Sequence, residues 1–383
     1  MDTQMVGRCP MEIPLARPYF DSEELQEIGR VLQSGWVSKG PESARFEAEV
    51  AKYVGVKHGV AVVNCTAALH LALLSLGIKK GDEVVVSDYT FPATAHAVLY
   101  CGARPVFVDV LPDTYNLDPS KIEELISPRT KALIPVHAFG QPARMDEVMR
   151  IAKENDLSVI EDAACSLGAT YQGKQSGSIG DLGCFSFHAR KGISTGEGGM
   201  VVGSDDELLE RARYLSVFGM KAAWERERAD EYSVPEFHDV GYNYKLSDVL
   251  AALGVIQMTR LNEIIKAKRD LARRYTDLLD AIEQVQSPLE AEGCKHVYQS
   301  YVVVLDEAIN RNRLIMELKK RGVQAQIGTY ACHVQPVYAS KQKCPVSRML
   351  MDRSLALPFY YSMGEKELGA VVEALKASIG AIS

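Results

Sequence analysis

The sequence predicts an α/β protein with a mostly parallel sheet, helices on both faces of that sheet, and a smaller C-terminal α+β domain. Between residues 58 and 204, short apolar stretches typical of strands alternate with stretches typical of helices. This is the pattern of parallel strands joined by crossover helices. The expected strands, such as "EVVVSD" and "PVFVDV", are β-branched and apolar on both faces, as expected when helices cover both sides of a sheet.

Two helices are expected before the first strand. Asp21 or Ser22 can cap the first helix, Glu24 can complete a capping box, and Gly35 can end the helix. A second amphipathic helix is expected near residues 43–53. Strands are then expected at "HGVAVVN", "EVVVSD", "PVFVDV", "KALIPVH", "SVIEDA", "CFSFH" and "GGMVVGS". Helices are expected between them at "TAALHLALLSLG", "ATAHAVLYCG", residues 119–126 and "MDEVMRIAKEN".

The C-terminal part begins with a long helix near residues 247–280, which shows repeated i, i+3, i+4 apolar spacing. A strand at "YQSYVVVL", a helix at "NRNRLIMELKKRG", a loop through "GTYACHVQPVYAS" and a final helix near residues 365–378 follow. We therefore expect a large domain over residues 1–255, including an N-terminal arm, and a small domain over residues 256–383.

The composition narrows the possible classes of protein. The net charge of the 383 residues is -7 and there is no basic run, so we expect no nucleic-acid partner. No apolar run has the length of a membrane span, and the N-terminus lacks the apolar core of a secretory signal. The eight cysteines form no CxxC pair, which disfavours a metal site. Scattered thiols in a chain of this size indicate a reducing cytoplasm.

Chemistry-bearing side chains follow three of the expected strands. Thr66 begins a helix whose free amides suit a phosphate, although Thr66 could equally be a simple N-cap. Glu161 and Asp162 end an apolar strand, where an acid is costly unless it meets a cation or reaches the surface. Ser186 and Lys191 follow a third strand, which could also end at an ordinary solvated turn.

Together these three strand ends indicate pyridoxal 5'-phosphate. This cofactor needs an amine for a covalent bond, an acid beside its ring nitrogen and a phosphate site. The amine must be available in its neutral form, and we expect burial beside cations to lower the pKa of Lys191. Competing motifs for nucleotide binding, zinc proteases and serine hydrolases (GxGxxG after the first strand, GxxxxGK[ST], HExxH and GxSxG) are absent from the sequence.

The chain resembles the DegT/DnrJ/StrS sugar-aminotransferase family of fold-type-I pyridoxal-phosphate enzymes over nearly its whole length. The motifs that carry the resemblance are "IPLARP", "SGWVSKGP", "NCTAALHLALLSLGI", "DYTFPATA", "PVHAFGQPA", "EDAACSLGA", "CFSFHARKGISTGEGGMV", "GYNYKLSD" and "LALPFY". By this resemblance Lys191 is the lysine that binds the cofactor covalently. Asp162 is the partner of its ring nitrogen, and Phe91 stacks on its ring.

The resemblance also implies how the cofactor phosphate is held and that the protein is a homodimer. Thr66, the Ala67 amide and Ser186 match the phosphate site of one subunit. Asn243 matches a phosphate ligand supplied by the neighbouring subunit, so that the two active sites are shared. The charged stretch "KAAWERERADEYSVPEFHD" before Asn243 is interpreted as a solvated arm that reaches outward.

Four other residues need comment. Cys65 stands where relatives usually have Gly, and Cys165 stands where they often have Gln or His. Relatives with His in place of the lysine act as dehydratases, and Lys191 argues against that branch. His137 is interpreted as structural, whereas His333 is expected on the substrate side.

We therefore expect an aminotransferase that moves an amino group from an amino acid, by resemblance glutamate or glutamine, to a keto group of a nucleotide-linked deoxysugar. Such a reaction belongs to amino-sugar and polysaccharide biosynthesis. A cyclic ketone without a nucleotide, such as a keto-inositol, remains an alternative substrate. A non-catalytic protein that retains the fold is a second alternative, which the presence of Lys191 and Asp162 disfavours.

Overall fold

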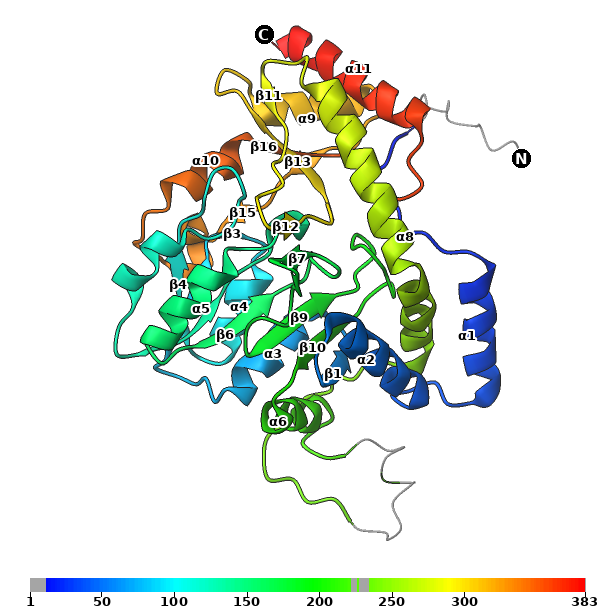
Figure 1. Cartoon of the computed structure of the whole chain (residues 1–383), viewed down its shortest axis with the longest axis vertical. Helices are drawn as coiled ribbons and strands as arrows, with labels where there is room; N and C mark the ends of the chain where they lie inside the picture. Colours follow the sequence, from blue (N-terminus) through cyan, green and yellow to red (C-terminus); the bar gives the residue numbers. More distant parts are fainter. Residues whose placement is uncertain (1–11, 222–225, 227–233, 383) are drawn as a thin grey trace, which may run out of the picture.

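The computed structural model describes residues 12–221, 226 and 234–382, and a seven-stranded sheet lies at its centre (Figure 1). Its strands are β1 (His58–Val62), β2 (Glu83–Ser87), β4 (Arg104–Val108), β5 (Thr130–Ile134), β6 (Ser158–Asp162), β9 (Leu182–Ser186) and β10 (Gly199–Gly203). The order across the sheet is β1-β10-β9-β6-β5-β2-β4. The strands from β4 to β9 run parallel, and β10 is antiparallel to both of its neighbours. The predicted mostly parallel sheet is therefore confirmed.

Helices cover both faces of the sheet (Figure 1). The helices of this region are α1 (Ser22–Ser34), α2 (Pro41–Val54), α3 (Cys65–Ser75), α4 (Ala93–Tyr100), α5 (Met145–Glu154), α6 (Asp206–Ser216) and α8 (Asp248–Leu279). Helices α3, α4 and α6 pack on one face, and α2, α5 and α8 pack on the other. Along β2, Val84 and Val86 join the first layer, whereas Val85 joins the second. This alternation explains why the strands are apolar at consecutive positions.

The predicted capping signals of α1 are present. Asp21 is the N-cap, its side chain accepts a hydrogen bond from the Glu23 amide, and Glu24 completes a capping box. Gly35 ends the helix in the left-handed region, with φ of 75°. The N-terminal arm expected before this helix includes residues 1–11, which lie outside the described part of the chain.

Helix α8 connects the two parts of the molecule. Its side chains Val255 and Leu261 pack with the large sheet, whereas Leu271 and Tyr275 pack with the C-terminal cluster. The expected boundary between residues 255 and 256 falls inside this 32-residue helix, so the division into two domains stays a prediction. Among the described residues, no helix is both long and apolar enough to span a bilayer.

The C-terminal part is built on an antiparallel sheet of four strands in the order β11-β13-β16-β14. Its elements are β11 (Val285–Gln286), β13 (Tyr301–Leu305), α9 (Arg311–Lys320), β14 (Gln326–Ile327), α10 (Pro345–Arg353), β16 (Ser354–Leu357) and α11 (Glu365–Ile382). Smaller strands pair elsewhere: β12 (Cys294–Lys295) with β7 (Thr170–Tyr171), β7 with β8 (Lys174–Gln175), and β15 (Tyr330–Ala331) with β3 (Tyr89–Thr90).

Three expectations about secondary structure are wrong in detail. The helix expected over residues 119–126 is two short 3-10 helices, η1 (Pro119–Lys121) and η2 (Glu123–Leu125). The final helix continues to Ile382 rather than ending near residue 378. Helix α10 and strand β16 were not predicted, because each is too short to show a clear period.

A buried carboxylate joins the start of α8 to the start of α2. Gly40 is the N-cap of α2 and has no side chain to bond the free amides. Asp248 takes this place: Oδ1 accepts hydrogen bonds from the Gly40 amide at 2.7 Å and the Ser43 amide at 2.9 Å, and Oδ2 accepts one from the Glu42 amide at 3.0 Å. A negative group at this position also interacts favourably with the helix dipole.

Removing this carboxylate leaves several buried donors unsatisfied. We expect Asp248→Ala to lower the free energy of unfolding by about 2–4 kcal/mol, measured by urea denaturation. Asp205 is a suitable control, because it caps α6 from an exposed position through one bond to the Leu208 amide. Asp205→Ala should cost only about 1 kcal/mol. Equal losses for the two variants would contradict the special role of Asp248.

Candidate functional site

Several polar side chains gather at one edge of the large sheet. Asp88 follows β2, His137 lies beyond β5, Asp162 ends β6 and Ser186 ends β9. The carboxyl ends of parallel strands lie along the same edge, which is where ligands bind in open α/β sheets.

Asp162 is the buried acid of this edge. Its Oδ2 accepts a hydrogen bond from the Thr94 hydroxyl at 2.7 Å, and its Oδ1 accepts one from the Ala164 amide at 3.2 Å. Burial raises the pKa of the Asp162 carboxyl, and the two hydrogen bonds and the charge of Lys191 only partly oppose this effect. A cationic group placed against Asp162 would therefore be strongly favoured.

Lys191 lies close enough to interact with this acid. It follows β9, and its Nζ donates a hydrogen bond to Cys165 Sγ at 3.1 Å. Burial lowers the pKa of the Lys191 amine, whereas the Cys165 thiol raises it. The charges of Cys65 and Asp162 act in the same direction as Cys165, so the net shift of the Lys191 pKa is upward. The expectation of a lowered pKa is wrong for this arrangement, because the effects of Cys165, Cys65 and Asp162 on the amine outweigh the effect of burial.

The start of α3 lies beside Ser186. The helix begins at Cys65, and Asn64 is its N-cap, because Asn64 Oδ1 accepts a hydrogen bond from the Ala67 amide at 2.8 Å. The alternative in which Thr66 is the N-cap is therefore wrong, and the Ala67 amide is already bonded to Asn64. Thr66 is the second residue of the helix, so it lies in the first turn.

Gly199 allows this turn to approach the sheet. It pairs with Ser186 across β9 and β10, and a Cβ at Gly199 would lie 2.3 Å from the carbonyl carbon of Asn64. No side chain fits there. Gly199 therefore makes room for the beginning of α3, which brings the first turn of that helix next to Ser186.

Phe91 lies between β3 and α4. Its ring is 65% exposed and meets the Tyr330 ring edge-on, with 6.2 Å between centroids. The Thr94 amide donates a hydrogen bond to the Phe91 carbonyl at 3.3 Å, and the Thr94 hydroxyl holds Asp162. Thr94 therefore fixes Phe91 relative to the acid, a role that the sequence analysis did not recognise.

The two histidines singled out in the sequence have different partners. His137 is buried, its Nε2 lies 2.8 Å from Glu161 Oε2, and its Nδ1 accepts a hydrogen bond from the Ala143 amide. Glu161 also accepts bonds from three amides of the loop that precedes β9. The structural interpretation of His137 agrees with these contacts.

His333 is held by a buried acid. Its Nδ1 and its amide nitrogen each lie 2.6 Å from an oxygen of Asp88. Cys344 lies near both, and one potential metal-binding atom from each of the three residues falls within 4.8 Å of the others. The bond between the His333 ring and Asp88 already satisfies two members of this group. The pairing of β15 with β3 places His333 beside the segment that carries Phe91.

Asn243 is exposed, and its side chain contacts Lys245. Its backbone bridges to Val217, and the next residue, Tyr244, accepts a hydrogen bond from the Val63 amide at 2.8 Å. Asn243 therefore lies near the start of α3. Among the described residues, its side chain bonds to Lys245 and not to Thr66. Much of the stretch interpreted as an outward arm, residues 222–225 and 227–233, lies outside the described residues.

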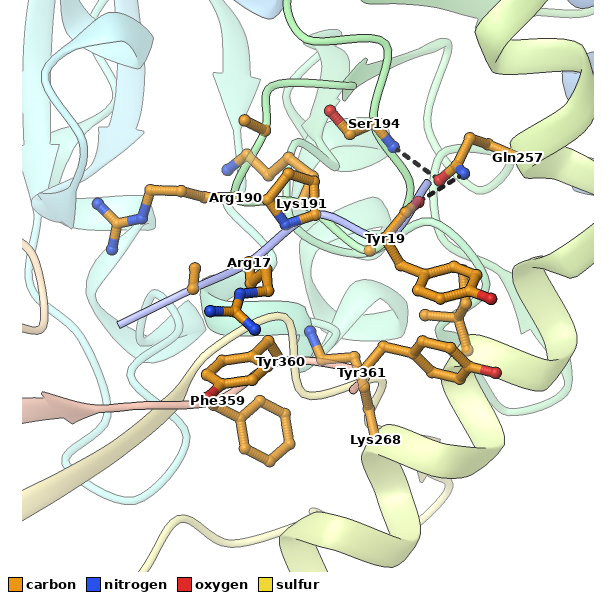
Figure 2. Close-up of a pocket in the computed structure, with 15 residues that line it drawn as sticks. Arg17, Tyr19, Arg190, Lys191, Ser194, Gln257, Lys268, Phe359, Tyr360 and Tyr361 are labelled. Carbon is orange, nitrogen blue, oxygen red and sulfur yellow. Dashed lines mark hydrogen bonds between the residues drawn. The ribbon is translucent and has the colours of Figure 1, made fainter. Parts of the chain in front are cut away.

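Lys268 is a further site residue that the sequence analysis missed. It projects from α8, is only 5% exposed and lines a cavity together with Lys191 (Figure 2). Its Nζ donates a hydrogen bond to the Gln299 carbonyl at 2.9 Å and lies 5.1 Å from the centroid of the Phe359 ring. Burial lowers the pKa of Lys268 to about 7. Its sequence surroundings are those of an ordinary charged helix face, so no local signal marks it.

Pyridoxal phosphate fits the groups that the structure brings together. Within the described residues, the buried acid Asp162 forms no ion pair, and a protonated ring nitrogen would supply one. The Lys191 amine lies in the same group, and the Phe91 ring is largely exposed. Ser186 and the first turn of α3 offer a hydroxyl and a positive helix end for a phosphate.

Comparisons with known proteins agree with this site. The family described as the DegT/DnrJ/EryC1/StrS aminotransferase family matches residues 18–376. The spore coat polysaccharide biosynthesis protein SpsC of Bacillus subtilis is 39% identical over 382 residues, covering 97% of this chain and 98% of SpsC. The UDP-4-amino-4-deoxy-L-arabinose--oxoglutarate aminotransferase of Shewanella sediminis is 35% identical, covering 96% of this chain and 98% of that protein.

A solved structure shows the same architecture. The protein Spr1654 of Streptococcus pneumoniae, solved in a PLP-form, has a TM-score of 0.90 and 26% sequence identity. The alignment covers 97% of this chain and 100% of that one. The chain therefore belongs to the DegT/DnrJ/EryC1/StrS aminotransferase family and is a pyridoxal-phosphate-dependent aminotransferase.

Proposed function

We propose that this aminotransferase moves the amino group of glutamate to the keto group of a nucleotide-linked deoxysugar. The observation that carries the proposal is the group formed by Lys191, Asp162 and Phe91 at one edge of the sheet. Thr94 bonds both Asp162 and Phe91, and the charge of Asp162 acts on Lys191. The name of the Shewanella relative supports a nucleotide-linked amino sugar and an oxoglutarate–glutamate pair. The name of SpsC supports a place in polysaccharide biosynthesis.

Lys191 is the proposed proton carrier. When bound, pyridoxal phosphate supplies an electron sink that stabilises negative charge on the substrate carbon. The Lys191 amine, once free, would accept a proton from that carbon and deliver it to the C4' atom of the cofactor. Cys165, the hydrogen-bond partner of Nζ, positions this amine. Because the pKa of Lys191 is shifted upward, the amine keeps its proton until a positive charge nearby lowers that pKa. A cationic ring bound against Asp162 would have this effect.

The remaining site residues are proposed to hold the cofactor. Asp162 keeps the ring nitrogen protonated, and Phe91 covers one face of the ring. Ser186, Thr66 and the amides at the start of α3 bind the phosphate, with the Ala67 amide becoming available if the Asn64 side chain turns away. His333 is proposed to contact the sugar substrate from the adjoining loop.

A homodimer is proposed because the surface around Asn243 is rich in exposed apolar side chains. Tyr100, Phe218, Phe237 and Val240 are all at least 42% exposed. The rings of Tyr100 and Tyr242 both contact the His70 ring, and the Phe218 amide donates to the Tyr242 carbonyl. Such a patch is typical of a protein interface. It would bring Asn243 to the phosphate of the partner subunit in a two-fold arrangement.

A cytoplasmic location is proposed on the state of the cysteines. The seven cysteines that the structure describes are all free, and four of them are buried. Free thiols in this number are typical of a reducing compartment. Nucleic-acid and membrane partners are not expected.

The substrate proposal is tested with a panel of keto-sugar nucleotides and glutamate, with products read by mass spectrometry. We expect an amino-sugar nucleotide and an equal amount of 2-oxoglutarate, and Lys191→Ala should form neither. Amination of a keto-inositol but of no sugar nucleotide would contradict the proposed substrate class. A protein that stays colourless with added cofactor would contradict the catalytic role itself.

Asp162 is expected to be essential for turnover. Asp162→Asn keeps the shape of the side chain but removes the charge that protonates the ring nitrogen, so turnover should fall by about 100-fold or more. Thr94→Val removes one hydrogen bond to Asp162 and should have a much smaller effect. Both rates are measured with glutamate alone by following the cofactor absorbance, and circular dichroism checks the fold. Near-normal turnover of Asp162→Asn would show that the acid is structural.

The shared site is tested with a mixed dimer of Lys191→Ala and Asn243→Ala chains. If Asn243 serves the partner, one site of the mixed dimer carries both lesions and the other carries neither. The isolated mixed dimer should then show roughly half of the wild-type activity, although each parent homodimer is impaired. Normal cofactor affinity in the Asn243→Ala homodimer, or a mixed dimer without restored activity, would contradict the cross-subunit role.

A further inference from the structure

A cavity next to Lys191 is lined by cations and by no acid. Its fifteen lining residues include Arg17, Arg190, Lys191 and Lys268, and none of the fifteen is Asp or Glu. Arg17 comes from the segment before α1, Arg190 and Lys191 follow β9, and Lys268 projects from α8. Figure 2 shows Arg17 and Lys268 in the middle of the view with Tyr360 and Tyr361 beside them, whereas the Arg190 side chain extends to the left.

Three of these cations have no carboxylate partner within the described part of the chain. Arg17 lies over the Tyr360 ring, 5.7 Å from its centroid. Arg190 Nη1 donates a hydrogen bond to the Gln326 side-chain oxygen at 3.3 Å. Lys268 bonds to a backbone carbonyl of Gln299. In a chain with net charge -7, a cavity with four cations and no acid is a locally positive site.

Lys268 is the most telling member, because burying an ammonium without a counter-ion destabilises the folded protein. An ammonium has three donors, and among the described residues Lys268 bonds to one acceptor, the Gln299 carbonyl. Burial, with a smaller effect of the nearby Lys191 charge, lowers the pKa of Lys268. By contrast, the equally buried Lys39 has Glu47 at 2.5 Å. The fold therefore balances one buried lysine internally and leaves the other to a ligand.

We propose that Lys268, with Arg17 and Arg190, forms a subsite for the carboxylate groups of a dicarboxylate amino donor. The proposal rests on the glutamate-dependent function proposed above and identifies the residues that recognise the donor. Charge-assisted hydrogen bonds to a carboxylate would occupy the free donors of Lys268 and the two guanidinium groups.

The position of the subsite favours a carboxylate over the diphosphate of a nucleotide sugar. Lys268 and Lys191 line two cavities in common, so the ammonium lies close to the amine that handles the proton. In an amino acid, a carboxylate is attached directly to the reacting carbon. In a nucleotide sugar, the ring separates the keto carbon from the diphosphate. Two or more cations also match a donor with two carboxylates better than one with a single carboxylate.

The test measures binding rather than turnover. Glutarate has both carboxylates of the donor but no amino group, so it binds without reacting. We expect the cofactor-loaded wild-type protein to bind glutarate in calorimetry, and Lys268→Met to bind it about tenfold or more weakly. Lys268→Arg should retain most of the affinity. Lys39→Met, the control at a buried lysine with an internal partner, should bind glutarate as the wild type does.

Stability separates a lost ligand contact from a damaged fold. Because Lys268 has no counter-ion, Lys268→Met should raise the Tm by a few degrees, about the effect expected for removing a buried unpaired charge. Lys39→Met should lower the Tm, since it leaves Glu47 with one cation fewer. A Lys268→Met protein that is more stable and yet binds glutarate poorly supports the subsite.

The pH dependence gives a second signature. Three titratable groups interact with Lys268. Cys165 raises the pKa of Lys268 and Lys191 lowers it, whereas Lys268 lowers the pKa of His296. Because the Lys268 pKa is about 7 and a bound carboxylate favours the charged form, glutarate affinity should fall as the pH rises above 7. In Lys268→Arg this fall should be much smaller, since the guanidinium keeps its proton.

The outcomes also separate this subsite from the proposed function. If the wild type accepts no amino group from glutamate, the proposed function fails, whatever the variants do. If glutamate reacts and Lys268→Met binds glutarate normally, the subsite is wrong while the function stands. If Lys268→Met instead loses affinity for the sugar nucleotide alone, the anion bound there is the diphosphate and the carboxylate assignment is overturned.

Discussion

The need to bury the Asp162 carboxyl at the end of β6 organises the active site. A charged acid in this position requires positive charge and hydrogen bonds, and the protein alone supplies only part of them. Thr94 and the Ala164 amide hold the two oxygens, and Lys191 adds a charge nearby. The remaining deficit would be met by a cationic ring, which is the role proposed for the cofactor. Thr94 also donates its amide to the Phe91 carbonyl, so one residue holds both the acid and the turn that carries Phe91.

The two adjacent acids on β6 lie in different surroundings because the side chains of a strand alternate between its two faces. Successive side chains of a strand point to opposite faces, so Glu161 and Asp162 enter different environments. Glu161 is enclosed by three loop amides and His137 and needs nothing more. Asp162 faces the amine of Lys191 and depends on a ligand. Lys39 and Lys268 repeat this contrast among the buried lysines, because Lys39 pairs with Glu47 whereas Lys268 has no carboxylate partner among the described residues.

How much the sequence reveals depends on whether a signal is local. The capping box of α1, the apolar strands of the large sheet and the strand-end positions of Asp162 and Lys191 are written in neighbouring residues, and these predictions agree with the structure. Asn64 was not recognised as the N-cap of α3, because Asn64 and Thr66, two positions apart, are both common N-cap residues. Lys268 gave no signal at all, since its burial results from the approach of α8 to residues 165, 299 and 359. The predicted direction of the Lys191 pKa shift was wrong for the same reason. Cys165, whose thiol raises this pKa, lies 26 positions away in the sequence.

The cap that Asp248 places on α2 has a consequence for the order in which the chain can fold. The carboxylate lies more than 200 positions after the amides whose hydrogen bonds it accepts. Among the described strands, β1 pairs with β10 alone. During synthesis, the first segments of the chain must therefore wait until more than half of the polypeptide has left the ribosome. Until then α2 lacks its cap and β1 has an unpaired edge, both of which favour association with other chains. The N-terminal segments should consequently be the part of a nascent chain that most needs a chaperone.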